Sequence, residues 1–414
     1  MPPELPPATS TPARPPAARL AASPYLRLSL FYAAFLSVVG VLQPFWPLWL
    51  KARGLDPAEI GLVLAIGIGV KVVGLPIAAH AADRSGQRQR LMLALAAASL
   101  LSFALFGPAH GFWPIVLVNL LFFSLWPPVM SLAESLTLMA ARDHGFEYGR
   151  VRLWGSIAYI ATALLAGAIL ARVPADAVLW MVLACVALTV LACARLPDRR
   201  AQRSLSSSPP ILDVLRSRPF ALMVLACGLI QGSHAVYYAF GTIHWQRAGY
   251  GEALIGALWA EGVACEVALF AYSGAVLRRL GPGGLIMMAG LAAAVRWIGT
   301  GLTDWVPAIA ALQTLHAFSF GAAHLSAMHW INRHVPPALS ATAQSLYSGV
   351  VWGLFLGCAL LAAGLLYESQ ASHAYLPMAI AALLGLAAAG PLWTAERRDP
   401  GRKDGVRKDD GPSL

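Results

Sequence analysis

Long apolar runs separated by short polar segments dominate the chain. Each run holds about twenty residues, the length that an α-helix needs to cross the hydrocarbon core of a bilayer. Lipid offers no partner to free backbone N–H and C=O groups, so each run is expected to form a helix. The pattern predicts twelve spans, at about 25–50, 57–80, 91–107, 113–140, 151–171, 177–195, 219–247, 253–276, 285–303, 307–332, 341–366 and 374–394.

The two halves of the chain repeat each other at an offset of 195 residues. Gly54 and Gly61 fall on Gly249 and Gly256 when shifted by that amount, and Gly86 falls on Gly281. Duplicated helix bundles are typical of secondary transporters, whose substrate site lies between the repeats. The sequence therefore predicts an all-α membrane protein of two six-helix pseudo-repeats, 25–195 and 219–394. A proline-rich extension (1–24), a linker (196–218) and a basic tail (395–414) are expected to be disordered and cytoplasmic.

Composition and charge placement support this interpretation. Hydrophobic residues make up 58% of the chain, charged residues 12%, and the mean hydropathy is +0.64. With twelve spans, 24 of the 30 Lys and Arg residues fall on the side that holds both termini, and four fall on the opposite side. This asymmetry follows the positive-inside rule, so both termini are expected to be cytoplasmic and the protein to lie in a bacterial inner (plasma) membrane. The net charge of +10 then requires no nucleic-acid partner.

Ionisable residues inside the spans are the first candidates for function. A charge at mid-bilayer costs about 2.5–3.5 kcal/mol on insertion scales, so each needs a reason. Lys71, Glu134, Glu266 and Arg296 lie within spans. Glu266 and Arg296 are predicted to pair, and a carboxylate that exchanges an arginine for a proton can carry that proton. The alternative is a static ion pair that only fixes helix packing.

Histidines and aromatic residues add further candidates. Gln313, His316, Phe320 and His324 follow one face of an α-helix, where His316 and His324 could relay protons or bind a carboxylate. Such histidines could equally hydrogen-bond a neighbouring helix. Other positions are predicted to line a substrate cavity: Gln43, Trp46, Lys71, His234 and Tyr238. The alternatives are the interfacial aromatic belt for Trp46 and snorkelling for Lys71.

The segment Asp83-Arg84-Ser85-Gly86-Gln87-Arg88 resembles the loop motif of the major facilitator superfamily. The resemblance implies that Asp83, Arg84, Gly86 and Arg88 serve conformational switching. Ala79 departs from the glycine that is usual in the family. Longer segments are similar to the bacterial 3-phenylpropionate permease group, over about 26–393 of the chain: Pro44–Leu55, Tyr148–Ser156, Gln231–Tyr238, Trp259–Val267, Val295–Trp297 and Gln313–His316.

A more distant likeness to the lactose permease group implies roles for several of these residues. Glu134 and Arg152 match its sugar-side carboxylate and arginine. Its helix 8 carboxylate, helix 9 arginine and helix 10 histidine are matched by Glu266, Arg296 and His316. The proton-carrying carboxylate and a lysine of that group are absent, since Ser319 and Gln313 stand in their places. The proton path would therefore run through Glu266 with help from His316 or His324.

Together these features predict a monomeric secondary transporter that couples inward proton flow to uptake of a small aromatic carboxylate. The proton gradient is the energy source, and no cofactor or metal is expected. Arg296 would bind the substrate carboxylate, and Trp46 and Tyr238 would hold its ring. The alternatives are symport of a neutral sugar or nucleoside through Glu134 and Arg152, and drug/proton antiport. A membrane enzyme or receptor is disfavoured because no phosphate loop, nucleophile elbow or metal-ligand spacing occurs.

Overall fold

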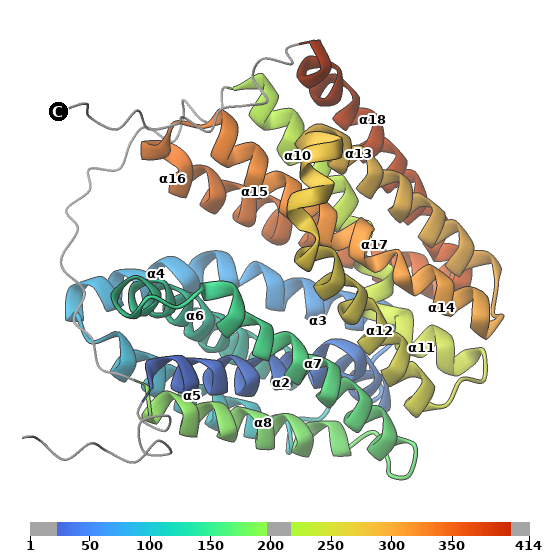
Figure 1. Ribbon diagram of the computed structural model, residues 1–414. Coiled ribbons are helices and arrows are strands. Elements are labelled where there is room, and N and C mark those ends of the chain that lie inside the picture. Colours follow the sequence, from blue (N-terminus) through green and yellow to red (C-terminus); the bar gives the residue numbers. More distant parts are fainter. Residues whose placement is uncertain (1–22, 197–216, 399–414) are drawn as a thin grey trace, which may run out of the picture.

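The computed structural model describes residues 23–196 and 217–398, and within these ranges the long regular elements are all helices (Figure 1). The predicted extension, linker and tail lie outside the described residues except at their boundaries. Helix α18 continues to Arg398, beyond the predicted start of the tail at residue 395.

The first half holds seven helical segments. In chain order these are α2 (Pro24–Ala52), α3 (Pro57–Gly69), α4 (Lys71–Ser85), α5 (Arg88–Ala104), α6 (Phe112–His144), α7 (Tyr148–Leu170) and α8 (Ala177–Ala194). α2 packs against α7 and α8, and α6 packs against α5 and α4. Stacked and edge-on aromatic rings fill the centre of this half, among them Trp46, Phe103 and Trp126.

The second half contains two stretches of π-helix. Its elements are α10 (Arg218–Gly232), α11 (Ala235–Arg247), α12 (Glu252–Ala271), α13 (Ser273–Leu302), α14 (Val306–Thr314), η1 (Ala317–Ala322), α15 (Ala323–His334), α16 (Pro337–Ser348), η2 (Gly349–Phe355), α17 (Leu356–Gln370), η3 (Ala371–Ala374) and α18 (Tyr375–Arg398). The π segments are η1 and η2, each inside a longer helix. Such segments are frequent at functional sites.

Ten helical stretches in the described ranges are long and apolar enough to cross a membrane. The count differs from twelve for two reasons. The predicted spans 341–366 and 374–394 form one run, Thr342–Arg398, that turns at Ala371, where φ is 49°. The predicted span 91–107 corresponds to α5, which has 17 residues. A multi-pass membrane protein is thus established, while the count of twelve and the cytoplasmic termini stay predictions.

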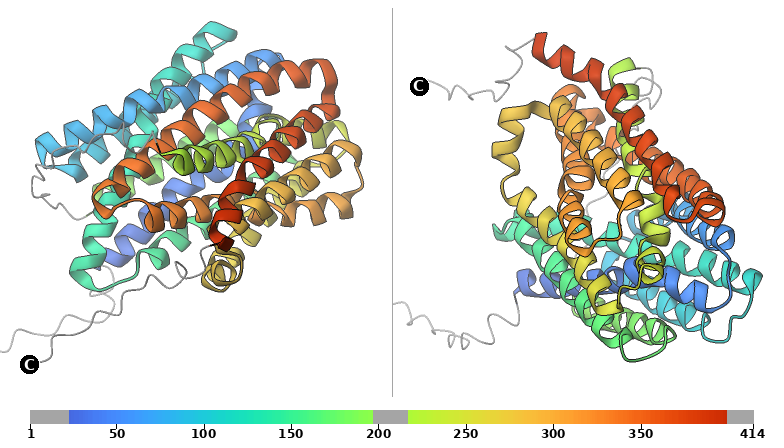
Figure 2. Two further views of the ribbon diagram at one scale, coloured as in Figure 1. Left: turned by 90° about the horizontal axis from the view of Figure 1, so that it is seen from above. Right: turned by 90° about the vertical axis from the view of Figure 1, so that its right-hand side faces the viewer.

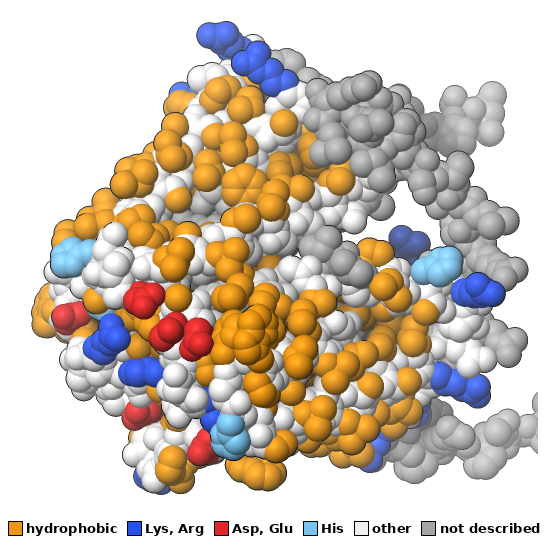
Figure 3. Space-filling view, turned by 180° about the vertical axis from the view of Figure 1, so that it is seen from behind, with side chains coloured by type: hydrophobic (Ala, Val, Ile, Leu, Met, Phe, Trp, Pro, Cys, Tyr) orange, Lys and Arg blue, Asp and Glu red, His pale blue; other side chains and the backbone are white. Residues whose placement is uncertain are grey.

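The surface fits that architecture. Apolar side chains cover most of the face in Figure 3, and charged side chains gather at its two ends. One of these ends is where α2 begins and α8 and α18 end, and it is called the linker end below. The opposite end, which carries the connections at 53–56, 171–176 and 248–251, is called the far end.

The sequence repeat has a structural cause. Gly54 and Gly249 lie two residues after the ends of α2 and α11, with nearly identical positive φ angles of 87° and 86°. Gly86 and Gly281 share φ values of 66° and 68° at the opposite ends of their bundles. A side chain at φ near +60° to +90° is strained, so glycine is favoured at both copies of each turn.

The two halves meet through close glycine contacts near the far end. A Cβ on Gly61 of α3 would lie 2.8 Å from the Cα of Gly364 in α17. A Cβ on Gly256 of α12 would lie 3.2 Å from the Cα of Gly167 in α7. Gly61 and Gly256 are repeat partners, so equivalent helices form both crossings. Figure 1 shows the halves packed together at this end and diverging toward the linker end, and Figure 2 shows the same helices from above and from the side.

Candidate functional site

Arg296 occupies the centre of the second half. Its side chain, on α13, is fully buried and lies over the rings of Tyr237 and Trp297, at 4.4 and 4.6 Å from guanidinium carbon to ring centroid. Its Nη2 donates a short 2.5 Å hydrogen bond to Gln313 Oε1, and its Nη1 donates to His316 Nδ1 at 3.0 Å. The charge is therefore held by neutral acceptors and π faces rather than by a carboxylate.

His316 is fixed by that bond. A guanidinium only donates, so His316 Nδ1 must accept, and the proton of the neutral ring lies on Nε2. Nε2 faces Glu266 Oε2 of α12 at 3.8 Å, within ion-pair range. The imidazole thus stands between the guanidinium and the carboxylate. The predicted direct pair of Glu266 and Arg296 is wrong in this conformation: they are linked through His316.

A second histidine extends the cluster. His234 is fully buried at the junction of α10 and α11, with Nδ1 3.0 Å from the carbonyl of Ile230 and Nε2 3.2 Å from Ser319 Oγ. Nδ1 therefore donates and Nε2 accepts. Arg296 Nη1 lies 3.4 Å from the same Ser319 hydroxyl. His234 is consequently a supporting member of the buried polar network rather than an open cavity wall.

Aromatic rings surround this network. Tyr237 stacks on Trp259 with centroids 4.3 Å apart, and Tyr238 stacks on His234 at 5.6 Å. Phe320 stacks on His316 at 5.1 Å. Tyr238 and Phe320 remain partly exposed, so they can meet a ligand. In the sequence, Tyr237 and Trp259 appear only as members of motifs shared with the permease group. The chain contains many aromatic residues, and the sequence does not reveal which of their rings lies beside Arg296.

The π segment η1 changes the predicted histidine stripe. Because a π turn holds more residues than an α turn, side chains beyond it rotate away from the α-helical face. His316 and Gln313 precede η1 and are buried. His324 follows it, and its ring lies 6.3 Å from Tyr347 and 6.5 Å from Trp352. His324 makes no hydrogen bond to Arg296 or Glu266, so the stripe divides into two separate sites.

The first half contributes a guanidinium that faces the second. Arg152, on α7, is partly exposed, with its carbon 5.9 Å from the ring centroid of Tyr32. Glu134 of α6, Glu266 of α12 and His324 are within electrostatic range of this guanidinium, but none of the three forms an ion pair with it. Glu134 itself is exposed. Arg152 therefore interacts electrostatically with one carboxylate of each half.

Trp46 does not lie in a binding cavity. It is 2% exposed, stacks on Trp49 at 4.5 Å and packs against Phe103 and Phe106. The predicted substrate-stacking role of Trp46 is wrong in this conformation, because the side chain is buried among aromatic rings of its own half. Gln43, one turn earlier, is partly exposed.

Lys71 begins α4, directly after the break at Val70. Its Nζ lies 5.6 Å from the ring centroid of Phe123, a cation–π contact within the first half. That contact explains how the charge is tolerated without a carboxylate. It places Lys71 away from the network around Arg296.

The predicted switch segment ends α4 and begins α5. Gly86 caps α4 in the left-handed conformation, and Arg88 Nη1 donates to Ser135 Oγ of α6 at 2.6 Å. Arg84 is exposed at the linker end. The side chain of Asp83 lies outside the described part of the structure.

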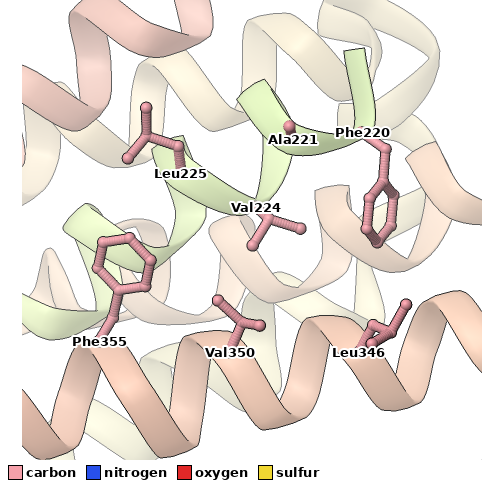
Figure 4. Close-up of a pocket in the computed structure, with 7 residues that line it drawn as sticks. All are labelled: Phe220, Ala221, Val224, Leu225, Leu346, Val350 and Phe355. Carbon is pink, nitrogen blue, oxygen red and sulfur yellow. The ribbon is translucent and has the colours of Figure 1, made fainter. Parts of the chain in front are cut away.

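A small pocket elsewhere is not a substrate site. Figure 4 shows it between α10 and the helix that contains η2, with a volume of about 180 Å³. Its lining is apolar throughout, including Phe220, Val350 and Phe355. A site that binds a small polar substrate needs a few placed polar groups, and these are missing from this lining.

Comparisons with known proteins bear on the identity. A family model described as "MFS_1 like family" matches residues 25–376. A protein of Escherichia coli strain K12 named "Probable 3-phenylpropionic acid transporter" is 32% identical over 368 residues, covering 86% of this chain and 94% of that protein. The maltose permease of Geobacillus stearothermophilus is 26% identical over 362 residues, covering 86% of this chain and 91% of its own.

Solved structures agree on the fold. A mutant of the nucleoside transporter NupG superposes with a TM-score of 0.78 at 14% identity, covering 91% of this chain and 99% of that one. An inward-facing, occupied bacterial homologue of the human lysosomal transporter Spinster gives 0.70 at 14% identity, covering 93% and 98%. Fold and relatives define a helical membrane transporter of the major facilitator type. The chain belongs to the MFS_1 like family.

Proposed function

We propose that this transporter couples inward proton flow to uptake of a small aromatic carboxylate such as 3-phenylpropionate. The observation that carries the proposal is the linked series Arg296–His316–Glu266, whose partly exposed carboxylate is within electrostatic range of Arg152 of the other half. The relative from E. coli, whose name specifies 3-phenylpropionic acid, supports the substrate class.

The substrate carboxylate binds Arg152. Arg296 is fully buried, and two acceptors and two π faces already occupy it, so it is poorly placed to receive a ligand. Arg152 is partly exposed, and an arginine fork matches a carboxylate in two parallel hydrogen bonds. The proposal therefore moves the anchor from Arg296, as the sequence suggested, to Arg152.

Coupling follows from competition for one guanidinium. With no substrate bound, Arg152 is proposed to compensate the charge of the Glu266 carboxylate, with which it interacts electrostatically. A proton on Glu266 removes that charge and frees Arg152 for the substrate. A state with both proton and substrate is thus charge-compensated, as is a state with neither. Only these two states cross readily between outward-open and inward-open forms, which produces symport.

His316 orients the proton site, and nearby rings hold the substrate ring. Its Nε2 points at Glu266, so it can donate to the carboxylate or pass a proton to it. Tyr238 and Phe320 offer partly exposed aromatic faces beside it. An offset-stacked or edge-on aromatic pair contributes about 0.5–1.5 kcal/mol beyond its buried area.

Direct binding of radiolabelled 3-phenylpropionate to purified protein tests the anchor. Arg152→Gln is expected to weaken binding at least tenfold, because one charge-assisted pair contributes about 1.5–3 kcal/mol. Arg150→Gln is the matched control, since Arg150 lies two residues away, is exposed and already pairs with Glu147 at 2.8 Å. Equal binding by the wild type and Arg152→Gln would contradict the proposed anchor.

Symport of a neutral sugar is the second candidate. The exposed carboxylate of Glu134 beside Arg152 favours it, because a carboxylate and a guanidinium together can hydrogen-bond several hydroxyls. The maltose permease relative supports it as well. Glu134→Gln separates the two: loss of transport is expected for a sugar, whereas an anionic substrate tolerates removal of the negative charge.

A further inference from the structure

A groove runs between α2 and α8 at the linker end, on the outside of the first half. Its volume is about 740 Å³, within the range of pockets that hold drug-sized molecules. Ala33 and Ala34 of α2 and Ala192 of α8 are among the small residues that line it. Because these side chains are short, the two helices leave a hollow along their seam.

Leucines form the rim of this groove. Leu30 of α2 is 52% exposed, and Leu188 and Leu191 of α8 are 55% and 58% exposed. Both helices are candidate membrane spans, so these side chains face lipid. The hollow is therefore an apolar slot that opens sideways into the membrane.

Two arginines stand at the mouth of the slot. Arg27 lies one turn above Leu30 on α2, and Arg195 lies one turn beyond Leu191 at the end of α8. In the part of the chain that the structure describes, no carboxylate pairs with either guanidinium. The opposite end of the same helix pair differs, because Arg53 there bridges to Asp176 at 3.2 Å. Among the described residues, the arginine at the far end of this helix pair thus has a carboxylate partner, whereas the two arginines at the linker end have none.

We propose that this groove binds one anionic phospholipid. Its phosphodiester is held between Arg27 and Arg195, and an acyl chain lies in the slot beside Leu30 and Leu191. A guanidinium fork matches phosphate oxygens, and basic pockets between membrane helices are known to favour anionic headgroups. A soluble anion would make no use of the apolar slot, and a zwitterionic or neutral lipid would leave the two arginines without compensation.

Native mass spectrometry of the full-length protein in detergent tests this, with phosphatidylglycerol and phosphatidylcholine of identical chains as probes. The wild type is expected to retain phosphatidylglycerol preferentially. Each basic residue near a membrane surface contributes about a fivefold preference, so Arg27→Gln with Arg195→Gln is expected to reduce retention about 30-fold. Ala192→Leu fills the slot without changing the charge, and retention of both lipids is expected to fall.

The matched control removes two charges elsewhere at the same end. Arg278→Gln with Arg279→Gln, both exposed in α13, is expected to bind phosphatidylglycerol like the wild type. If this control lost as much phosphatidylglycerol as the double variant of Arg27 and Arg195, the retention would depend only on the overall positive charge of this end. That result would overturn the proposed lipid site. Equal retention of both lipids by the wild type would overturn it as well. Competition by glycerol phosphate at the lipid's own concentration would identify a soluble phosphate site instead.

Discussion

Replacing Gly256 with alanine is expected to shift the transporter away from the conformation that is closed at the far end. The added Cβ would lie 2.5 Å from the carbonyl oxygen of Ala163 and 3.2 Å from the Cα of Gly167. Both are backbone atoms of α7, so no side chain can rotate to make room. Helices α12 and α7 must move apart at this crossing.

The magnitude follows from the cost of overpacking. One extra methyl group in a well-packed contact costs about 1–3 kcal/mol. A state in which the halves separate at the far end escapes that cost, so its population relative to the closed state is expected to rise about 5- to 150-fold. Gly61→Ala, at the repeat-equivalent crossing, is expected to act in the same direction, since its Cβ would meet Leu360 O at 2.7 Å.

Distances between spin labels measure this shift. Labels at Arg172 and Ser369 report on the two halves at the far end, because both positions are exposed there. The five native cysteines would be replaced, so that only the cysteines introduced at these two positions carry a label. Gly256→Ala is expected to raise the share of long distances. Gly390→Ala is the control, since a Cβ there meets nothing within 4 Å. An unchanged distance distribution in folded Gly256→Ala, or an equal shift in the control, would refute the reasoning.

Three further predictions concern the site. Trp46→Phe is expected to leave the affinity for 3-phenylpropionate unchanged, because Trp46 packs inside the first half. A large loss of affinity in binding assays would instead show that Trp46 belongs to the substrate site. Tyr238→Leu is expected to weaken the same binding about 2- to 12-fold through loss of an aromatic face, and unchanged binding would remove Tyr238 from the site. Gln313→Leu deprives buried Arg296 of an acceptor and is expected to cost about 1–3 kcal/mol in thermal unfolding, while Gln344→Leu in α16 should cost less; equal costs would argue against the network.

The sequence predicted the architecture well because its signals are local. Span length reflects bilayer thickness, and glycine repeats mark turns and crossings that only glycine allows. The superfamily and the 3-phenylpropionate resemblance are confirmed by the comparisons. The number of spans was harder to predict, since α5 has only 17 residues and helical structure continues through the short polar segment around Ala371.

The sequence predicted which residues belong to the site better than it predicted how they contact one another. Arg296, His316 and Glu266 stand out as costly residues in apolar runs, but their connectivity depends on how three helices rotate against each other. The π segment η1 sets the direction of His324, and no pattern in the sequence announces it. Trp46 and Trp259 look alike as isolated tryptophans, and only packing places the second beside the buried guanidinium.

Uptake into proteoliposomes tests the central claim most directly. Radiolabelled 3-phenylpropionate and a galactoside would each be offered with and without an inward proton gradient, to the wild type and to Glu266→Gln. The proposed coupling predicts gradient-driven accumulation of 3-phenylpropionate by the wild type. Glu266→Gln is expected to bind the substrate and to lose accumulation, because Arg152 is then permanently free of its carboxylate competitor. Wild-type accumulation by Glu266→Gln, or accumulation of the galactoside alone, would contradict it.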